Sequence, residues 1–461
     1  MRAAHTLGLV IALGIFVTGG LFAAPAKPAK ASKPSQQDKK EFLAAKNAFL
    51  KQVRSRTPAD RIEAYRKFAE YGTPEAAEVI FKMGALDRSK EVRRAAIDAL
   101  MTLRESSEVG EELIAQMMLA ARRDKENSDD YIYAALWALG AWESPEIQGK
   151  VLKFLDDIAD NPNPELLTYC TLMDDLGVEG NAQALKTLML LSQARLFEKN
   201  FGYRRAVVQN ICQVLIPESI PFLIGMLSKT DGLVQHDIVQ HLTNVTLQKF
   251  KDDDAAWAKW WADNKAKFKM PDKNVLAKRD INIDDGTPTY YGIPICAKRV
   301  VFVLDTSGSM RGNRLDNAKR ELIAAIERLP DEVQISMVFY NSTARVWNAQ
   351  MVPANDVNKK LALYSIMQQE AAGQTASYDA LDGAFTIGPE AIFFLSDGAP
   401  TTGKYVAPAD IVGVITQGNK TRRVSIHTIG LGEKGIWEAT LGKFMQALAA
   451  ANWGTYRAVE S

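Results

Sequence analysis

The chain has 461 residues, of which 47% are hydrophobic and 24% charged, and its formal net charge is +1. This composition is typical of a globular protein with more than one core, and it excludes collagen-like, wholly disordered and multi-span membrane chains. The balanced charge favours no nucleic-acid partner, and four His and three Cys leave little for a zinc cluster or a disulfide scaffold.

The first 24 residues are interpreted as a bacterial-type export signal. A short basic start, Met1-Arg2, precedes a continuous apolar stretch over residues 7–24, and small residues follow it. The alternative is an uncleaved anchor, which would place the protein at a membrane, because the stretch approaches a spanning length. Residues 25–40 contain mainly Pro, Ala, Lys and Ser and predict a disordered basic linker. We therefore expect a periplasmic, envelope-associated or secreted bacterial protein.

Residues 41–250 are expected to be almost entirely helical. Similar segments recur at intervals of 31 to 39 residues, beginning at Pro58, Glu91, Asp130, Pro164, Gly202 and Leu233. A period of this length predicts a solenoid of helix pairs, because a single pair cannot bury its own apolar face. An irregular helical bundle is the alternative.

The second of these segments carries the most specific pattern. Val92, Ala96 and Leu100 form an apolar helical stripe within the string Glu-Val-Arg-Arg-Ala-Ala that starts at Glu91. This string resembles the HEAT family of repeats, which implies a scaffold or protein-binding surface. Cys170 and Cys212 lie among apolar residues of the same region and are interpreted as buried thiols, although an exported protein could join them.

Residues 251–295 are expected to form a Trp-rich helix and a connector. Trp257, Trp260 and Trp261 have the i, i+3, i+4 spacing of one helical face. We expect them to pack the last repeat against the next domain, and an exposed partner-binding stripe is the alternative. Residues 269–292 are polar and contain turn signals, which favours a connector.

From residue 296 the pattern changes to short apolar runs that alternate with amphipathic segments. Strands are expected over residues 300–304, 333–339, 391–395, 424–429 and 455–459, with an edge strand over 344–347. Helices are expected over residues 314–329, 357–370, 377–385, 407–418 and 437–450. This alternation predicts an α/β domain over residues 296–461, with a doubly wound, mainly parallel, Rossmann-like sheet.

Polar clusters follow two of these strands. Asp305, Ser307 and Ser309 come directly after the first strand, and Asp397 follows the third. Between them, the segment that contains Thr375 opens a helix. Ligands bind at the carboxyl ends of strands in such sheets, and a site made of oxygen donors alone suits a hard cation such as Mg²⁺ or Mn²⁺.

These residues resemble the metal-ion-dependent adhesion site of the von Willebrand factor type A domain. The family motif is Asp-x-Ser-x-Ser after the first strand plus a distant Thr and a distant Asp, and the matching residues are Asp305, Ser307, Ser309, Thr375 and Asp397. The resemblance implies that the hydroxyls coordinate the cation directly and that the carboxylates act mostly through water. It also implies that an Asp or Glu of a protein partner fills the vacant position.

The expected function is that of a non-enzymatic, exported interaction or adhesion protein with the helical repeats as a second binding scaffold. The phrase Tyr-Tyr-Gly-Ile-Pro at residues 290–294 also resembles bacterial proteins that combine repeats with a type A domain. One alternative is a structural envelope component whose metal only stabilises the fold. Another is a Mg²⁺-dependent hydrolase, which Ser307 disfavours because an Asp-x-Asp nucleophile would need a carboxylate there.

Overall fold

The computed structural model describes residues 36–122, 127–157, 159, 165–279, 281, 286–432 and 440–460. The expected export signal at residues 1–24, and residues 25–35 of the expected linker, lie outside this part of the chain. Helix α1 (Gln36–Gln52) begins inside the segment expected to be linker, so residues 36–40 are helical. The chain divides into two units, residues 1–48 and residues 49–461, and every element after α1 belongs to the second.

The described residues between α1 and residue 276 form helices, turns and loops. The helices are α2 (Pro58–Ala69), α3 (Pro74–Gly84), α4 (Lys90–Met101), α5 (Ser107–Arg122), α6 (Ser128–Leu139), α7 (Pro145–Asp157), α8 (Leu166–Leu176), α9 (Ala182–Leu191), α10 (Arg195–Lys199), α11 (Phe201–Val214), α12 (Ser219–Leu227), α13 (Gly232–Thr246), α14 (Asp254–Asn264) and α15 (Lys273–Leu276). Among all the described helices, we find none that is long and apolar enough to span a membrane.

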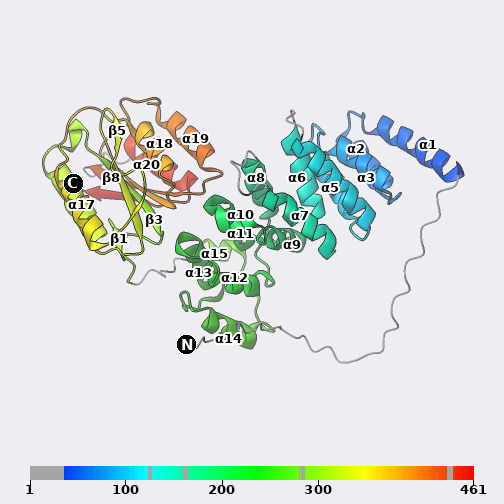
Figure 1. The fold of residues 1–461 in the computed structure, drawn as a ribbon, viewed down its shortest axis with the longest axis horizontal. Coiled ribbons are helices and arrows are strands. Elements are labelled where there is room, and N and C mark those ends of the chain that lie inside the picture. The colour runs from blue at the N-terminus through cyan, green and yellow to red at the C-terminus, as the bar shows by residue number, and fades with distance from the viewer. Residues whose placement is uncertain are drawn as a thin grey trace, which may run out of the picture. The chain divides into compact units, whose positions relative to one another are not determined.

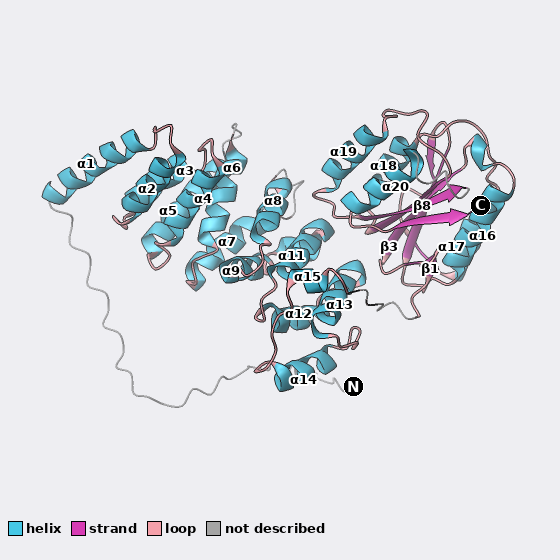
Figure 2. Cartoon of the chain, turned by 180° about the vertical axis from the view of Figure 1, so that it is seen from behind, coloured by secondary structure: helices cyan, strands magenta, loops and turns pink. Residues whose placement is uncertain are grey.

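These helices stack in two layers (Figures 1 and 2). In one layer each helix contacts the next in the series α2, α4, α6, α8, α11 and α13. In the other layer the series is α3, α5, α7 and α9. The six recurring sequence segments all supply the first layer. Helix α4 shows why the layers form, because Val92, Ala96 and Leu100 are all buried on one of its faces. The expected helical region is confirmed, and the likeness to HEAT repeats stays a resemblance.

The Trp-rich helix α14 packs against α12 of the helical region. Trp257 is fully buried, its ring meets Phe250 edge-on, and its Nε1 donates a hydrogen bond to the Lys251 carbonyl at 2.9 Å. Trp260 and Trp261 both contact Phe268. The Trp face thus packs on its own segment and on the helices before it, where contact with the following domain was expected.

Cys170 and Cys212 are not joined by a disulfide. Cys170 is buried, and burial raises the pKa of its thiol to about 11. Burial also raises the pKa of Cys212. Both side chains behave as small apolar groups, as interpreted from the sequence.

The C-terminal region forms a seven-stranded, mainly parallel sheet in the order β5-β4-β3-β7-β8-β9, with β6 pairing to β4. The parallel strands are β3 (Arg299–Asp305), β4 (Gln334–Tyr340), β7 (Ala391–Ser396), β8 (Ser425–Gly432) and β9 (Tyr456–Glu460). Strands β5 (Ala344–Val346) and β6 (Val352–Pro353) run antiparallel to β4. A separate hairpin, β1 (Thr289–Tyr290) and β2 (Ile293–Pro294), precedes the sheet. The expected doubly wound fold is confirmed.

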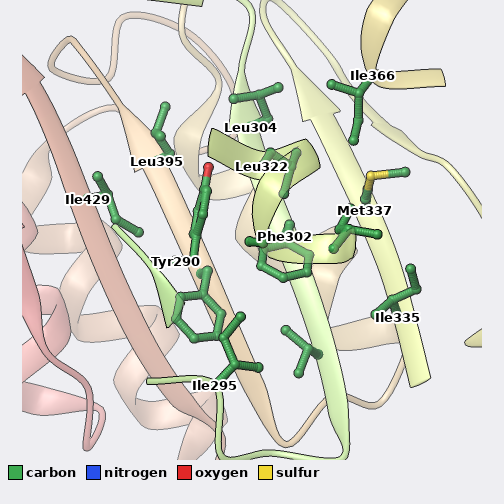
Figure 3. Packing of buried hydrophobic residues seen from close by; sticks show 14 of the residues in the cluster. Tyr290, Ile295, Phe302, Leu304, Leu322, Ile335, Met337, Ile366, Leu395 and Ile429 are labelled. Atoms are coloured by element: carbon green, nitrogen blue, oxygen red, sulfur yellow. The ribbon is translucent and has the colours of Figure 1, made fainter. Parts of the chain in front are cut away.

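Helices cover both faces of this sheet (Figure 1). They are α16 (Asn313–Glu327), α17 (Asp356–Met367), α18 (Ser377–Thr386), α19 (Pro408–Asn419) and α20 (Thr440–Ala451), with a short 3₁₀ turn, η1 (Gly308–Met310), after β3. Because side chains alternate along a strand, Phe302 faces the cluster under α16 and α17, and Val303 faces the one under α18 to α20. Figure 3 shows the first cluster, in which Tyr290 of the hairpin lies against Phe302.

Within the second unit, the helical region contacts the edge of the sheet where the parallel strands begin. Asp174 lies in the last turn of α8. The buried Arg423, just before β8, donates to both oxygens of the Asp174 carboxylate, each at 2.7 Å. Arg205 of α11 donates to the Arg423 carbonyl at 2.6 Å and also pairs with Asp237 of α13. Lys298, just before β3, pairs with Asp231, just before α13, with 3.8 Å between Nζ and Oδ2. These contacts leave the carboxyl ends of the strands at the opposite edge.

Replacing Gly202 by Ala is expected to destabilise this contact. A Cβ at Gly202 would lie 1.9 Å from the Thr421 carbonyl oxygen, so either α11 or the loop before β8 must move. We expect a loss of about 1–3 kcal/mol in the free energy of unfolding, measured by denaturant titration. The matched control is Gly225→Ala in α12, where no atom lies within 4 Å and Ala should stabilise the helix by about 0.5–1 kcal/mol. Equal effects at both positions would contradict the close approach.

Candidate metal centre

The strand order places the switch point of the sheet between the carboxyl ends of β3 and β7, where a crevice is expected. From β3 the chain crosses through α16 to β4, and from β7 it crosses through α19 to β8 on the other side. The two loops therefore diverge, which is the arrangement that forms a ligand site in doubly wound sheets. Asp305 is the last residue of β3, and Asp397 follows the last residue of β7. The crevice thus brings together two carboxylates that are distant in sequence.

Asp305 is fully buried and held in place by two hydrogen bonds. Its Oδ1 accepts from the Ser307 amide at 2.8 Å, and its Oδ2 accepts from the Ser396 hydroxyl at 2.6 Å. Burial raises the pKa of Asp305 to about 6, the bonds from Ser396 and Ser307 oppose this rise, and the nearby Asp397 adds to it. A buried carboxylate that is costly to ionise is the kind of group that a bound cation stabilises.

A chain of hydrogen bonds links the two serines to the second carboxylate. The hydroxyls of Ser307 and Ser309 lie 3.0 Å apart, and the Ser309 hydroxyl donates to Asp397 Oδ1 at 2.7 Å. Ser307 is buried whereas Ser309 is exposed, so of these two hydroxyl-bearing residues only Ser309 reaches the surface. The η1 turn between them lets Gly308 approach the Gly373 carbonyl, to which its amide donates at 3.0 Å. Four of the five predicted ligands are therefore connected.

Thr375, the fifth predicted ligand, lies in the adjoining segment before α18. Backbone hydrogen bonds from Gly308 to Gly373 and from Ala372 to Thr306 tie this segment to the loop after β3. The Thr375 amide donates to the Thr401 hydroxyl at 2.9 Å, and its carbonyl accepts from the Thr401 amide. Thr375 is buried beside the loop, and its position is fixed from both sides.

Two further residues contact the predicted ligands, and sequence reasoning assigned neither a role. Ser396 directly precedes Asp397 in the chain, and its hydroxyl donates to Asp305 Oδ2 at 2.6 Å. Arg314, in the first turn of α16, places its Nη1 3.1 Å from Asp397 Oδ2 and 3.4 Å from the Ser309 carbonyl. The sequence around Arg314 does not indicate this contact, because Asp397 is 83 residues further along the chain.

The donor set fits a hard divalent cation. Two carboxylates and three hydroxyls supply oxygen alone, which is the ligand chemistry of Mg²⁺ and Mn²⁺ and disfavours softer metals. In the described residues there is no group of three or more His, Cys, Asp or Glu side chains that could hold a metal. A cation at this crevice would accordingly depend on Ser307, Ser309 and Thr375 as well as on the carboxylates.

Comparisons with known proteins agree with the fold. A family model described as the von Willebrand factor type A domain matches residues 298–458. Inter-alpha-trypsin inhibitor heavy chain H3 of Bos taurus is 31% identical over 90 residues, which cover 20% of this chain and 10% of the relative. Heavy chain H4 of Homo sapiens is 28% identical over 200 residues, which cover 39% of this chain and 20% of the relative.

Among solved structures, one described as von Willebrand factor type A from Catenulispora acidiphila is 24% identical, with a TM-score of 0.31. The match covers 36% of this chain and 40% of that chain. The chain spans a fifth or less of the length of the two inhibitor heavy chains. From the sheet order, its helical cover and the family match, we conclude that the described chain contains a helical region followed by an α/β domain, and that residues 298–458 of this domain match the von Willebrand factor type A family.

Proposed function

We propose that this chain is a non-enzymatic interaction protein whose type A domain binds Mg²⁺ or Mn²⁺ and captures an acidic residue of a protein partner. The ligands we assign are Asp305, Ser307, Ser309, Thr375 and Asp397. The observation that carries the proposal is the hydrogen-bonded chain from Asp305 through the two serines to Asp397 at the carboxyl edge of the sheet. Type A domains are often interaction or adhesion modules, which supports the same function.

The ligand types favour capture of an anion over hydrolysis. When bound, the cation supplies an electron-poor position that attracts a carboxylate, because neutral hydroxyls make up much of its donor set. Asp305 is fully buried and fixed by two hydrogen bonds, so it is poorly placed to attack a substrate, whereas its remaining lone pairs can still serve a cation. Ser309 and the rim of the crevice are exposed, which leaves the site open to a protein ligand.

We propose the helical region, residues 41–250, as a second protein-binding scaffold of HEAT-like repeats. A groove of about 680 Å³ lies between side chains of α4, α6 and α8. In it the Arg94 guanidinium stacks over Trp137 at 3.9 Å, and Tyr133 donates to Asp175 at 2.7 Å. The groove combines apolar, aromatic and charged groups, which is the composition of protein interfaces.

We also propose the remaining organisation that the sequence predicts. Residues 251–295 join the scaffold to the type A domain at residues 296–461, and residues 1–24 direct export to the periplasm, the envelope or the medium. The apolar stretch over residues 7–24 supports export.

The metal site is tested by calorimetric titration of the whole chain with Mg²⁺. The wild type should bind one equivalent, and Ser307→Ala and Ser309→Ala should each weaken binding about tenfold or more, because each removes a ligand. The matched control is Thr306→Val, which removes a hydroxyl from the same loop. That hydroxyl bonds to the Tyr340 carbonyl at 3.0 Å, so Mg²⁺ affinity should not change. Equal affinities in the wild type and both Ser variants would refute the ligand assignment.

Partner capture is tested by retention of envelope proteins on the immobilised chain, with Mg²⁺ or with a chelator. We expect partners to be retained with Mg²⁺, lost with the chelator, and lost in Ser309→Ala under both conditions. Identical retention with and without metal would instead favour a structural role for the cation.

A further inference from the structure

The metal centre contains a cationic side chain of its own. Arg314 pairs with Asp397, with 3.1 Å between Nη1 and Oδ2, and the Asp397 side chain has no exposed surface whereas that of Arg314 is 31% exposed. Asp397 Oδ1 accepts from Ser309 at 2.7 Å, so each oxygen of this carboxylate has a different partner. The guanidinium thus lies between a buried candidate ligand and solvent.

Local backbone geometry explains how Arg314 reaches this position. Gly312 has φ 79° and ψ −141°, a conformation that other residues rarely adopt, and it turns the chain from η1 into α16. This turn sets Arg314 at the second residue of α16, directly beside the loop that carries Ser309. Leu315 is buried on the core side of the helix, which leaves Arg314 on the side of the crevice.

The formal charges give this contact a consequence. Asp305 and Asp397 together balance a divalent cation, so a loaded site without Arg314 would be neutral. The cation, the two carboxylates and the Arg314 guanidinium together carry one positive charge, which a single added carboxylate balances. Because like charges repel, Arg314 should also weaken the binding of the cation alone.

We propose that Arg314 couples the cation to the anionic ligand through its charge. It lowers the affinity of the centre for the bare cation and raises that of the loaded centre for a carboxylate, so cation and carboxylate bind tightly together. This inference rests on the proposed metal site. Arg314 gives the loaded centre a preference for an anion with a single charge, which the five residues assigned to hold the cation do not provide by themselves.

The test is calorimetric Mg²⁺ titration of the whole chain in sodium chloride and in sodium acetate of equal ionic strength, with acetate as the carboxylate probe. In chloride, Arg314→Gln should bind Mg²⁺ about tenfold more tightly than the wild type, the order expected for one unit charge acting on a divalent ion across a few ångströms of hydrated protein. Acetate should tighten Mg²⁺ binding to the wild type and have a smaller effect in Arg314→Gln. Arg314→Lys keeps the charge and should resemble the wild type.

Arg320→Gln is the matched control, because it removes the same charge from α16 at a residue that contacts Asn317 and not Asp397. It should bind Mg²⁺ like the wild type. If Arg314 only held Asp397 in place, Arg314→Gln would bind Mg²⁺ equally or more weakly, and that result overturns the inference while the metal site stands. Absence of Mg²⁺ binding in the wild type overturns the proposed function and this inference together. Circular dichroism in chelator verifies that each variant is folded.

Discussion

Replacing Asp305 by Asn is expected to abolish Mg²⁺ binding and, in the absence of metal, to stabilise the protein. Asn can keep both observed contacts, since its oxygen can accept from the Ser307 amide and its nitrogen can donate to the Ser396 hydroxyl, which also lies 3.0 Å from the Gly398 carbonyl. The substitution removes a buried negative charge. The same charge that the cation needs is therefore a cost to the metal-free fold.

The pKa of Asp305 gives the size and the sign of this effect. Burial raises it to about 6 from an ordinary value of 3.8, so in chelator the ionised carboxylate costs the folded state up to about 3 kcal/mol at pH 7.5. The folded state binds a proton more tightly than the unfolded state, so this group makes the wild type less stable as pH rises from about 4 through 6. We expect Asp305→Asn to be about 1–3 kcal/mol more stable than the wild type at pH 7.5 in chelator.

Denaturant titrations in chelator and in saturating Mg²⁺ measure both effects. Mg²⁺ should stabilise the wild type and leave Asp305→Asn unchanged. The matched control is Asp331→Asn, which neutralises a carboxylate whose side chain is 72% exposed and should alter neither quantity. A Mg²⁺-dependent gain in Asp305→Asn equal to that of the wild type would show that Asp305 is not a ligand.

The sequence predicted the sheet, and it predicted that the candidate site residues gather at one end of it, because both depend on local patterns. The apolar runs before Asp305 and Ser396 are continuous, as expected for parallel strands buried on both faces, and the observed strands match the expected ones within a few residues. Knowing that the carboxyl ends of parallel strands share one edge was enough to predict that Asp305 and Asp397 lie close together. The spacing within the loop after β3 then placed Ser307 and Ser309.

What the sequence did not predict depends on contacts between distant segments. The hairpin that buries Tyr290 against Phe302 has strands of two residues, too short to show a period. Arg314 and Ser396 acquire their roles only when α16 and β7 flank the crevice. The pairing of Arg423 with Asp174 joins residues 249 positions apart, so neither charge has a neighbour in sequence that indicates its partner.

Mild acid is expected to destabilise the helical region and the sheet through two separate histidines. His427 of β8 stacks on Phe393, and its Nδ1 accepts from the Thr455 amide at 3.1 Å, a bond that protonation would break. Burial, with the nearby charges of Arg205 and His236, lowers the pKa of His427 to about 4. Burial likewise lowers the pKa of His241 in α13 to about 4, and its buried Nε2 has no hydrogen-bond partner in the described part of the chain.

The direction of the pH effect follows from these lowered values. Each histidine is neutral in the folded protein, and it takes up a proton more readily when the protein is unfolded. Its contribution to the free energy of unfolding is therefore complete above about pH 6.5 and is lost as pH falls to about 4. We expect each to cost about 2 kcal/mol at pH 4.5 relative to pH 7.5. Glu390 and Asp305 act in the opposite direction, because burial raises their pKa values. The effect of each histidine on acid stability must therefore be measured as the difference between the wild type and a variant that lacks that histidine.

Hydrogen exchange at pH 4.5 and 7.5, corrected for the intrinsic pH dependence of exchange, separates the two contributions. Peptides of α13 should lose protection in acid in the wild type and lose less in His241→Gln, and peptides of β8 should do the same for His427→Gln. Arg205 of α11 pairs with Asp237 of α13 and donates to the Arg423 carbonyl, and Arg423 pairs with Asp174, so hydrogen bonds and an ion pair connect the two regions. If those contacts make the regions open together, each single variant will protect both sets of peptides. If each variant protects only its own set, the regions open independently, and unchanged exchange in both variants would contradict the histidine assignment.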